Sequence, residues 1–506
     1  MRNSKKVSVL LSYVNILMGM VINLVLTPLL IDHLTDESYS MYKVMQSFVG
    51  PLIMFNLGVS TIVARSIAKY QADDEGSLHE KRNTFATAIL VSVLMALLVI
   101  GIGIIMAISI PHIYGANYSA DLIRDGQLIF GIGVLTTAIH IVTEAFKGCI
   151  IGHEKFVFQY GNQSIQYLLR FGWVILAIKL GWGAVAVSFS NLLISALVLM
   201  AYIVYTLMGL KERPHLYGLN KAELAQIFSF SLAILLQTIV NQVNNNVDLM
   251  ILGAIEINKE IITMYSSALT IYTVYNSMIT VFANLYFPQA VKEVTRGSSP
   301  QALTDFVIKP GRIQAAVAMA VIFGFAVLGR DFISLWIGEK YMNAYYVTLI
   351  LIIPVTIPLV QNVCISILDA RLKRMFRSVM LLGMAAINVC LSLLLVHVIG
   401  FWGAAIGTVI SLVVGNVIVM NIYYQKVIGI QIIRMFREIF RGILPAGLLA
   451  GIINIPSLVF GQPNMWIFLI KGLGFLATYG ICLWLFGLNS EEKKQVKQTF
   501  RLRKTC

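Results

Sequence analysis

Charged side chains are scarce in this sequence. Lys, Arg, Asp and Glu make up 12% of the 506 residues, whereas hydrophobic residues make up 58%. A soluble protein carries roughly twice that charged share, so a soluble fold is excluded. Apolar runs of about 20 residues, the length that crosses a bilayer, recur along the whole chain. The composition therefore predicts an all-α, polytopic membrane protein.

Cysteine pairs and cofactor motifs are also missing. The five cysteines stand far apart, at positions 149, 364, 390, 482 and 506, without a disulfide framework or a zinc spacing. The sequence has no Walker loop, dinucleotide fingerprint or nucleophile elbow. We therefore expect no metal, no cofactor and no enzymatic activity. Without an ATP site, transport would be driven by an ion gradient, the membrane potential or the substrate gradient.

About fourteen transmembrane helices are predicted. They cover residues 7–31, 41–64, 84–110, 125–147, 157–178, 184–209, 225–253, 262–287, 313–335, 343–368, 378–399, 402–424, 442–461 and 465–487. With a cytoplasmic N-terminus, 30 of the 38 Lys and Arg residues fall on the inner side and six on the outer side. This bias follows the positive-inside rule and places both termini in the cytoplasm. It also explains the net charge of +14 without a nucleic-acid partner.

Short matches recur along the chain at an offset of 220–223 residues. The matching pairs are Met41-Tyr42 with Met264-Tyr265, Lys69 with Lys292, Ile113–Tyr118 with Trp336–Tyr341, and Gly183-Ala184 with Gly403-Ala404. Their common order predicts duplication of a six-helix unit, and an even number of helices gives both copies the same orientation. We expect two pseudo-symmetric lobes, residues 1–222 and 223–424. Residues 425–506 would add two further helices and a basic cytoplasmic tail.

The seventh predicted span carries an unusual polar stripe. Gln237, Asn241, Asn244 and Asp248 are spaced by four, three and four residues, so they share one helix face. Such a stripe is costly against lipid and should face other helices or a wet cavity. Asp248 has three interpretations: a coupling-ion site for H⁺ or Na⁺, a partner of Lys43 or Arg170, or a solvated helix-end residue.

The fifth predicted span has the same spacing in Gln159, Gln163, Gln166 and Arg170. An arginine near mid-span costs about 2.5–3.5 kcal/mol on insertion scales. One interpretation is an ion pair or carbonyl contact inside the bundle. The other is an anion contact in a translocation cavity, which the accompanying glutamines favour.

Other spans carry polar faces as well. The first has Ser12, Asn15, Gly19 and Asn23, the second Lys43, Gln46 and Gly50, and the eighth Tyr272, Asn276 and Thr280. Asn, Ser and Thr also join helices by hydrogen bonds, but several stripes together favour a hydrated cavity. The predicted substrate-binding residues are Arg170, Lys43, Gln166, Gln163, Asn15, Asn23, Gln46, Gln237, Asn241, Asn244 and Asn276. A stripe of His140, Glu144 and Lys147 is expected to be solvated, and Lys471 to be structural or in contact with lipid.

Several segments resemble a known family. They are Thr27-Pro28-Leu29-Leu30, Tyr42, Asn56–Ser60 leading to Arg65 and Tyr70, Asp248–Gly253, and Met264-Tyr265-Ser266. These resemble the oligosaccharide flippases of polysaccharide biosynthesis, the Wzx-like group of the MOP superfamily, to which MATE exporters and lipid II flippases are related. The resemblance covers the whole chain.

The resemblance implies a flippase that moves an undecaprenyl-diphosphate-linked oligosaccharide across the bacterial plasma membrane. Its expected partners are that lipid-linked oligosaccharide, membrane lipids and other membrane proteins of polysaccharide assembly. Alternatives on the same scaffold are a multidrug or cation antiporter and a peptidoglycan-precursor flippase. A membrane glycosyl transferase or polymerase would need a long outer loop with acidic or His residues, which the predicted spans leave no room for. A structural membrane scaffold is disfavoured by Arg170.

Overall fold

The structure is a computed structural model. It describes residues 2–70, 77–115, 117–218, 238–239, 242, 246–255, 258–371, 375–458, 464–494 and 497. These ranges are almost entirely helical and contain no β-strand, so the predicted all-α class is confirmed. Eleven helices within them are long and apolar enough to cross a membrane.

The other three predicted spans correspond to α6 (Phe156–Lys179), α9 (Lys259–Thr295) and the segment 225–253. Most of that segment lies outside the described residues, so the count of fourteen stays a prediction. By its contacts the chain divides into two compact units, residues 1–266 and 267–506. The predicted lobe boundary near residue 222 also falls outside the described residues, and the lobe limits stay a prediction.

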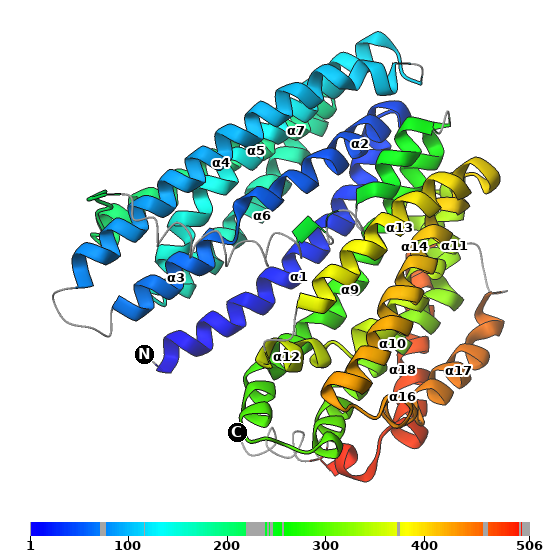
Figure 1. Ribbon diagram of the computed structural model, residues 1–506. Helices are drawn as coiled ribbons and strands as arrows, with labels where there is room; N and C mark the ends of the chain where they lie inside the picture. Colours follow the sequence, from blue (N-terminus) through cyan, green and yellow to red (C-terminus); the bar gives the residue numbers. More distant parts are fainter. Residues whose placement is uncertain are drawn as a thin grey trace. The chain divides into compact units, whose positions relative to one another are not determined.

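Unit 1 is a bundle built around one central helix (Figure 1). It contains α1 (Arg2–His33), α2 (Asp36–Leu52), α3 (Val59–Tyr70), α4 (Ser77–Tyr114), α5 (Ala120–Gly152), α6, α7 (Ala184–Val204) and the short helix Asn246–Ile255. The central helix is α5, which packs against α2, α3, α4 and α7. Its buried face includes Ala145 and Cys149, which join Ile67 and Phe85 in one apolar core.

Local sequence signals explain where these helices begin. Thr35 is the N-cap of α2, and its hydroxyl accepts a hydrogen bond from the Ser38 amide at 3.2 Å. Asp36 and Glu37 follow in the first turn, where negative charge favours the helix dipole. Ser119 caps α5 in the same way.

The second predicted span is broken in the middle. Helix α2 ends in a 3₁₀ turn, Ile53–Asn56, and α3 starts only at Val59. Leu57 and Gly58 between them have positive φ angles of 52° and 63°, which glycine adopts readily and leucine does not. The Asn56 side chain accepts a hydrogen bond from the Gly58 amide at 2.9 Å. A broken span is tolerated in a membrane where it is buried in protein or lines a cavity.

Unit 2 is organised around α10, which packs against α11, α16, α17 and α18. Helix α9 begins in unit 1 and continues into unit 2. The further helices are α10 (Pro300–Trp336), α11 (Asn343–Val360), α12 (Val363–Ala370), α13 (Met375–Ile399), α14 (Trp402–Leu412), α15 (Met420–Tyr423), α16 (Ile432–Phe440), α17 (Ile443–Asn454) and α18 (Met465–Cys482). Short π-helical segments continue α14, α15 and α18.

Arg312 ties together the predicted cytoplasmic end of unit 2. Its side chain is 7% exposed. It donates to both carboxylate oxygens of Glu492, at 2.7 and 3.0 Å, and to the backbone oxygens of Glu438, Arg441 and Gly487. These bonds use all five guanidinium N–H donors. A buried arginine is therefore fully satisfied where α10 meets α16 and the residues that follow α18.

Candidate functional site

Unit 1 contains a partly open cavity of about 430 Å³, with many polar lining residues, between α2, α5, α6 and α7. Its lining residues are Gln46, Val49, Gly50, Ile129, Gly133, Thr136, His140, Gln166, Tyr167, Arg170, Ser188, Asn191, Ile194 and Ser195. The structure thereby brings together three of the predicted binding residues: Gln46, Gln166 and Arg170.

Helical periodicity explains how four helices supply this lining. On α7, Ser188, Asn191 and Ser195 are three and four residues apart, so their side chains share one face. Gln166 and Arg170 on α6 are four residues apart and share another. The remaining polar groups come from Gln46 on α2 and from Thr136 and His140 on α5. Each helix therefore turns a narrow polar face inward.

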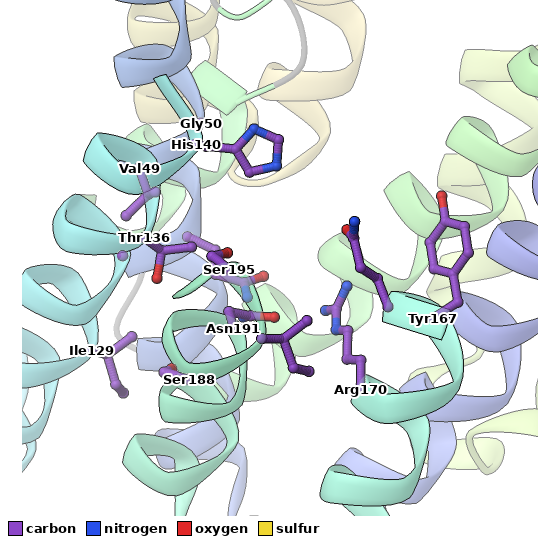
Figure 2. Close-up of a pocket in the computed structure, with 14 residues that line it drawn as sticks. Val49, Gly50, Ile129, Thr136, His140, Tyr167, Arg170, Ser188, Asn191 and Ser195 are labelled. Atoms are coloured by element: carbon purple, nitrogen blue, oxygen red, sulfur yellow. The ribbon is translucent and has the colours of Figure 1, made fainter. Parts of the chain in front are cut away.

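The cavity is cationic. Among the lining residues that the structure describes, Arg170 is the one that is permanently charged, and none is a carboxylate. Figure 2 shows Arg170 extending from α6 toward Asn191 and Ser195 of α7. An arginine that faces hydroxyl and amide groups instead of an acid keeps its donors available for an anionic ligand.

Lys43 adds a second positive charge near the cavity. It lies one turn before Gln46 on α2, and its ammonium nitrogen is 5.4 Å from the centre of the Tyr39 ring. Lys43 and Arg170 are close enough to repel each other. Two like charges without a neutralising acid between them favour binding of an anion.

Two predicted residues on α1 lie outside the cavity lining. The Asn15 side chain, 2% exposed, donates to the Tyr160 backbone oxygen at 2.8 Å and accepts from the Ser164 hydroxyl at 3.0 Å. Asn15 thus joins α1 to α6, as the helix-joining interpretation expects. Asn23 is exposed in unit 1.

Two further predicted residues also lie elsewhere. Gln163 on α6 donates to the Tyr167 hydroxyl at 3.4 Å and does not line the cavity. Asn276 belongs to unit 2, where its side-chain oxygen accepts from Thr280 at 3.5 Å. Gln237, Asn241 and Asn244 lie outside the described residues.

Asp248 is buried in unit 1, with 3% exposure. Its carboxylate accepts a 2.6 Å hydrogen bond from the Tyr265 hydroxyl of α9. The helix that carries it packs on α4, where the Tyr114 hydroxyl donates to the Met250 backbone oxygen at 3.1 Å. Burial of this depth argues against the solvated helix-end interpretation. The coupling-ion and ion-pair interpretations stay predictions.

Several lining residues escape sequence reasoning. Ser188, Asn191 and Ser195 lie within an apolar span, and their spacing was the signal that could have revealed a shared face. His140 is expected to be solvated, and in the structure it is exposed and also lines the cavity. Among the described residues, no group of three His, Cys, Asp or Glu side chains could hold a metal ion.

The sequence and the fold of this chain are both similar to those of known proteins. The family model described as polysaccharide biosynthesis protein matches residues 5–292, more than half of the chain. This chain belongs to the polysaccharide biosynthesis protein family. A search of curated protein sequences finds no match.

Solved structures of several membrane transporters share the fold of this chain. The inward closed conformation of the lipid II flippase MurJ is similar with a TM-score of 0.72 at 14% identity, covering 95% of this chain and 98% of that one. An inward-facing multidrug resistance MATE transporter has a TM-score of 0.59 at 14% identity, covering 88% and 95%. A MOP superfamily transporter from Pyrococcus furiosus has a TM-score of 0.52 at 14% identity, covering 83% and 96%. At these identities the likeness concerns the fold.

Proposed function

We propose that this membrane transporter is a flippase for a lipid-linked oligosaccharide, with an undecaprenyl diphosphate carrier, in the bacterial plasma membrane. The observation that carries the proposal is the cationic cavity of unit 1, with Arg170 among hydroxyl and amide groups. Membership of the polysaccharide biosynthesis protein family supports a sugar-containing cargo.

The lining residues suit the parts of such a substrate. A diphosphate carries negative charge, and the planar Arg170 guanidinium binds phosphate oxygens through two parallel hydrogen bonds. Hydroxyl and amide groups such as Ser188, Asn191 and Gln166 suit the hydroxyl groups of a sugar. The lipid tail would stay in the bilayer while the head group passes through the protein, with alternating access of the two lobes.

Rival functions make different demands on the same cavity. An exporter of cationic drugs would need a carboxylate in the binding cavity, and the described part of the chain places none in its lining. A peptidoglycan-precursor flippase would share the diphosphate but require another sugar and peptide. A glycosyl transferase or polymerase would need a positioned acid or base, and the one titratable base lining the cavity is His140.

The test is a translocation assay in liposomes that contain the purified protein. A lipid-linked saccharide with a fluorophore on its sugar is placed in both leaflets, and a membrane-impermeant quencher reports the rate of transfer. We expect the R170Q variant to lose at least about tenfold in rate, which corresponds to about 1.4 kcal/mol. Arg170 should bind the anionic head group, so the loss should be accompanied by weaker binding.

A matched control is Arg330, an exposed arginine at the end of α10 that contacts the Tyr345 and Tyr346 rings. The R330Q variant should transfer the lipid at the wild-type rate. If R170Q is equally active, Arg170 is structural. If the wild type moves cationic dyes but not the lipid-linked saccharide, the drug-exporter function is correct instead.

A further inference from the structure

His140 lies across the cavity from Arg170. The two residues belong to different helices, α5 and α6, and both line the same cavity. Figure 2 shows the His140 ring and the Arg170 side chain extending into the space between their helices. A histidine in contact with a polar, hydratable cavity can gain or lose a proton near neutral pH, unlike the other residues that line this cavity.

The charges around His140 come from few groups. On α5 itself, Glu144 and Lys147 act on it. These two are already bonded to each other, at 2.8 Å, so the Glu144 charge is largely compensated. The titratable groups that face His140 from α6 are Arg170 and the Tyr167 phenol.

The other neighbouring helices add little charge at His140. The lining residues of α2 and α7 are neutral, and Lys43 of α2 lies a turn farther along, near Arg170. Ser60 of α3 and Tyr202 of α7 interact with Glu144. Asp248, on the neighbouring short helix, is bonded to Tyr265. Within the described residues, no acid that lines the cavity therefore competes with an anionic ligand for a protonated His140.

We propose that His140 is a protonatable cation of the cavity lining, which binds a diphosphate opposite Arg170. The inference rests on the proposed function, because it concerns the anionic group of the same substrate. A diphosphate linked on both sides has two negative charges. Among the described lining residues, Arg170 and protonated His140 supply the two matching positive charges, and Lys43 lies outside the lining.

Proton and substrate then bind together. An anion that is held between the two groups stabilises protonated His140, and by linkage protonation strengthens anion binding. The loaded cavity therefore takes up a proton as it binds the head group.

The experiment measures binding to purified protein in lipid nanodiscs. The probe is farnesyl-diphospho-N-acetylglucosamine, a doubly linked diphosphate whose own charge is constant from about pH 5.5 to 8.5. For the wild type, Kd should rise about tenfold over this range. Calorimetry in two buffers with different ionisation enthalpies should show proton uptake on binding near pH 7.

Two variants of His140 distinguish the effect of its charge on binding from its effect on the structure. H140Q should bind weakly with little dependence on pH and without proton uptake. H140R, which stays charged, should bind at all pH values about as tightly as the wild type does in acid. Thermal melting of each variant checks its folding, and H140R keeps the test valid if H140Q is unstable.

The outcomes distinguish this inference from the proposed function. If R170Q weakens binding but H140Q keeps the wild-type pH dependence and proton uptake, the role of His140 is overturned and the flippase function stands. If the wild type itself binds without pH dependence, the role of His140 is overturned as well. If neither R170Q nor H140Q alters binding, both proposals are wrong.

Discussion

Lys471 on α18 forms a 2.8 Å ion pair with Asp331 on α10. The Lys471 side chain is 7% exposed and the Asp331 side chain 19%. A lysine inside an apolar helix is costly unless it is paired. The pair explains why a lysine is tolerated within this apolar helix. It also connects one of the two additional C-terminal helices to the central helix of unit 2.

Breaking this pair on one side should destabilise the protein. K471M leaves the Asp331 carboxylate buried without its counter-ion, and D331N does the same to the lysine. Removing one partner of a buried pair costs about 3–5 kcal/mol. Thermal melting in detergent should show a large fall in melting temperature for each single variant and a smaller fall for the double variant. If the loss in the double variant equals the sum of the losses in the two single variants, the two side chains do not act as a pair.

The bond between Arg312 and Glu492 predicts a pH dependence of stability. Burial raises the pKa of the Glu492 carboxyl, but the hydrogen bonds from Arg312 and the Asn489 backbone and the charges of Arg312 and Lys309 outweigh it, so the pKa is lowered from its usual value. A carboxyl with a lowered folded-state pKa stabilises the protein at pH values above its unfolded pKa. This contribution is lost as the pH falls through the lowered pKa.

At neutral pH, E492Q should therefore melt at a lower temperature than the wild type. Its free energy of unfolding should be smaller by about 1.5–3 kcal/mol. The difference should persist near pH 5 and vanish in stronger acid, where the wild-type carboxyl is itself protonated. Melting curves between about pH 3 and 7 provide the measurement. A constant difference over this range would show that the charge of Glu492 is unimportant.

Close packing between α3 and α5 depends on Gly148. A methyl group at this position would stand 2.6 Å from the Ser60 backbone oxygen and 2.8 Å from the Val63 Cβ atom. We expect G148A to lower the melting temperature, with a cost of about 1–3 kcal/mol for overpacking. Gly101 on α4 is the matched control, because nothing lies within 4 Å of its added methyl group. G101A should be neutral or slightly stabilising; similar losses in both variants would contradict the packing argument.

These residues show why some features were predictable from the sequence and others were not. Arg170 can be identified from the sequence because its insertion cost demands an explanation, and Gly148 and Gly152 are four residues apart, a spacing typical of close helix packing. Both signals are local. Whether Asn15 contacts substrate or α6 depends on which helix lies opposite, and that is decided by residues about 145 positions away. The break at Leu57-Gly58 likewise needs a left-handed leucine, a conformation that its neighbours impose and its own propensity opposes.

The contacts of Asn15 predict a structural effect without an effect on substrate binding. N15A removes the bonds to the Tyr160 backbone and to the Ser164 hydroxyl. Hydrogen bonds between membrane helices contribute about 0.6–1.7 kcal/mol, so a modest fall in melting temperature is expected. Exposed Asn23 on the same helix is the control, and N23A should melt like the wild type. Loss of diphosphate binding in a folded N15A protein would instead assign Asn15 to the site.

Substitutions at Asp248 and at its partner Tyr265 distinguish a role in ion coupling from a role in helix packing. If it binds H⁺ or Na⁺, D248N should abolish the dependence of transport on that ion gradient, because the amide cannot be protonated or neutralise a cation. If it only anchors its helix through Tyr265, D248N should keep gradient dependence and mainly lower stability. Y265F removes the 2.6 Å hydrogen bond but keeps the carboxylate, so it reports packing alone. Liposome transport with imposed H⁺ or Na⁺ gradients, compared with melting of both variants, decides between them. Gradient-dependent transport by D248N at the wild-type rate would exclude Asp248 as the coupling site.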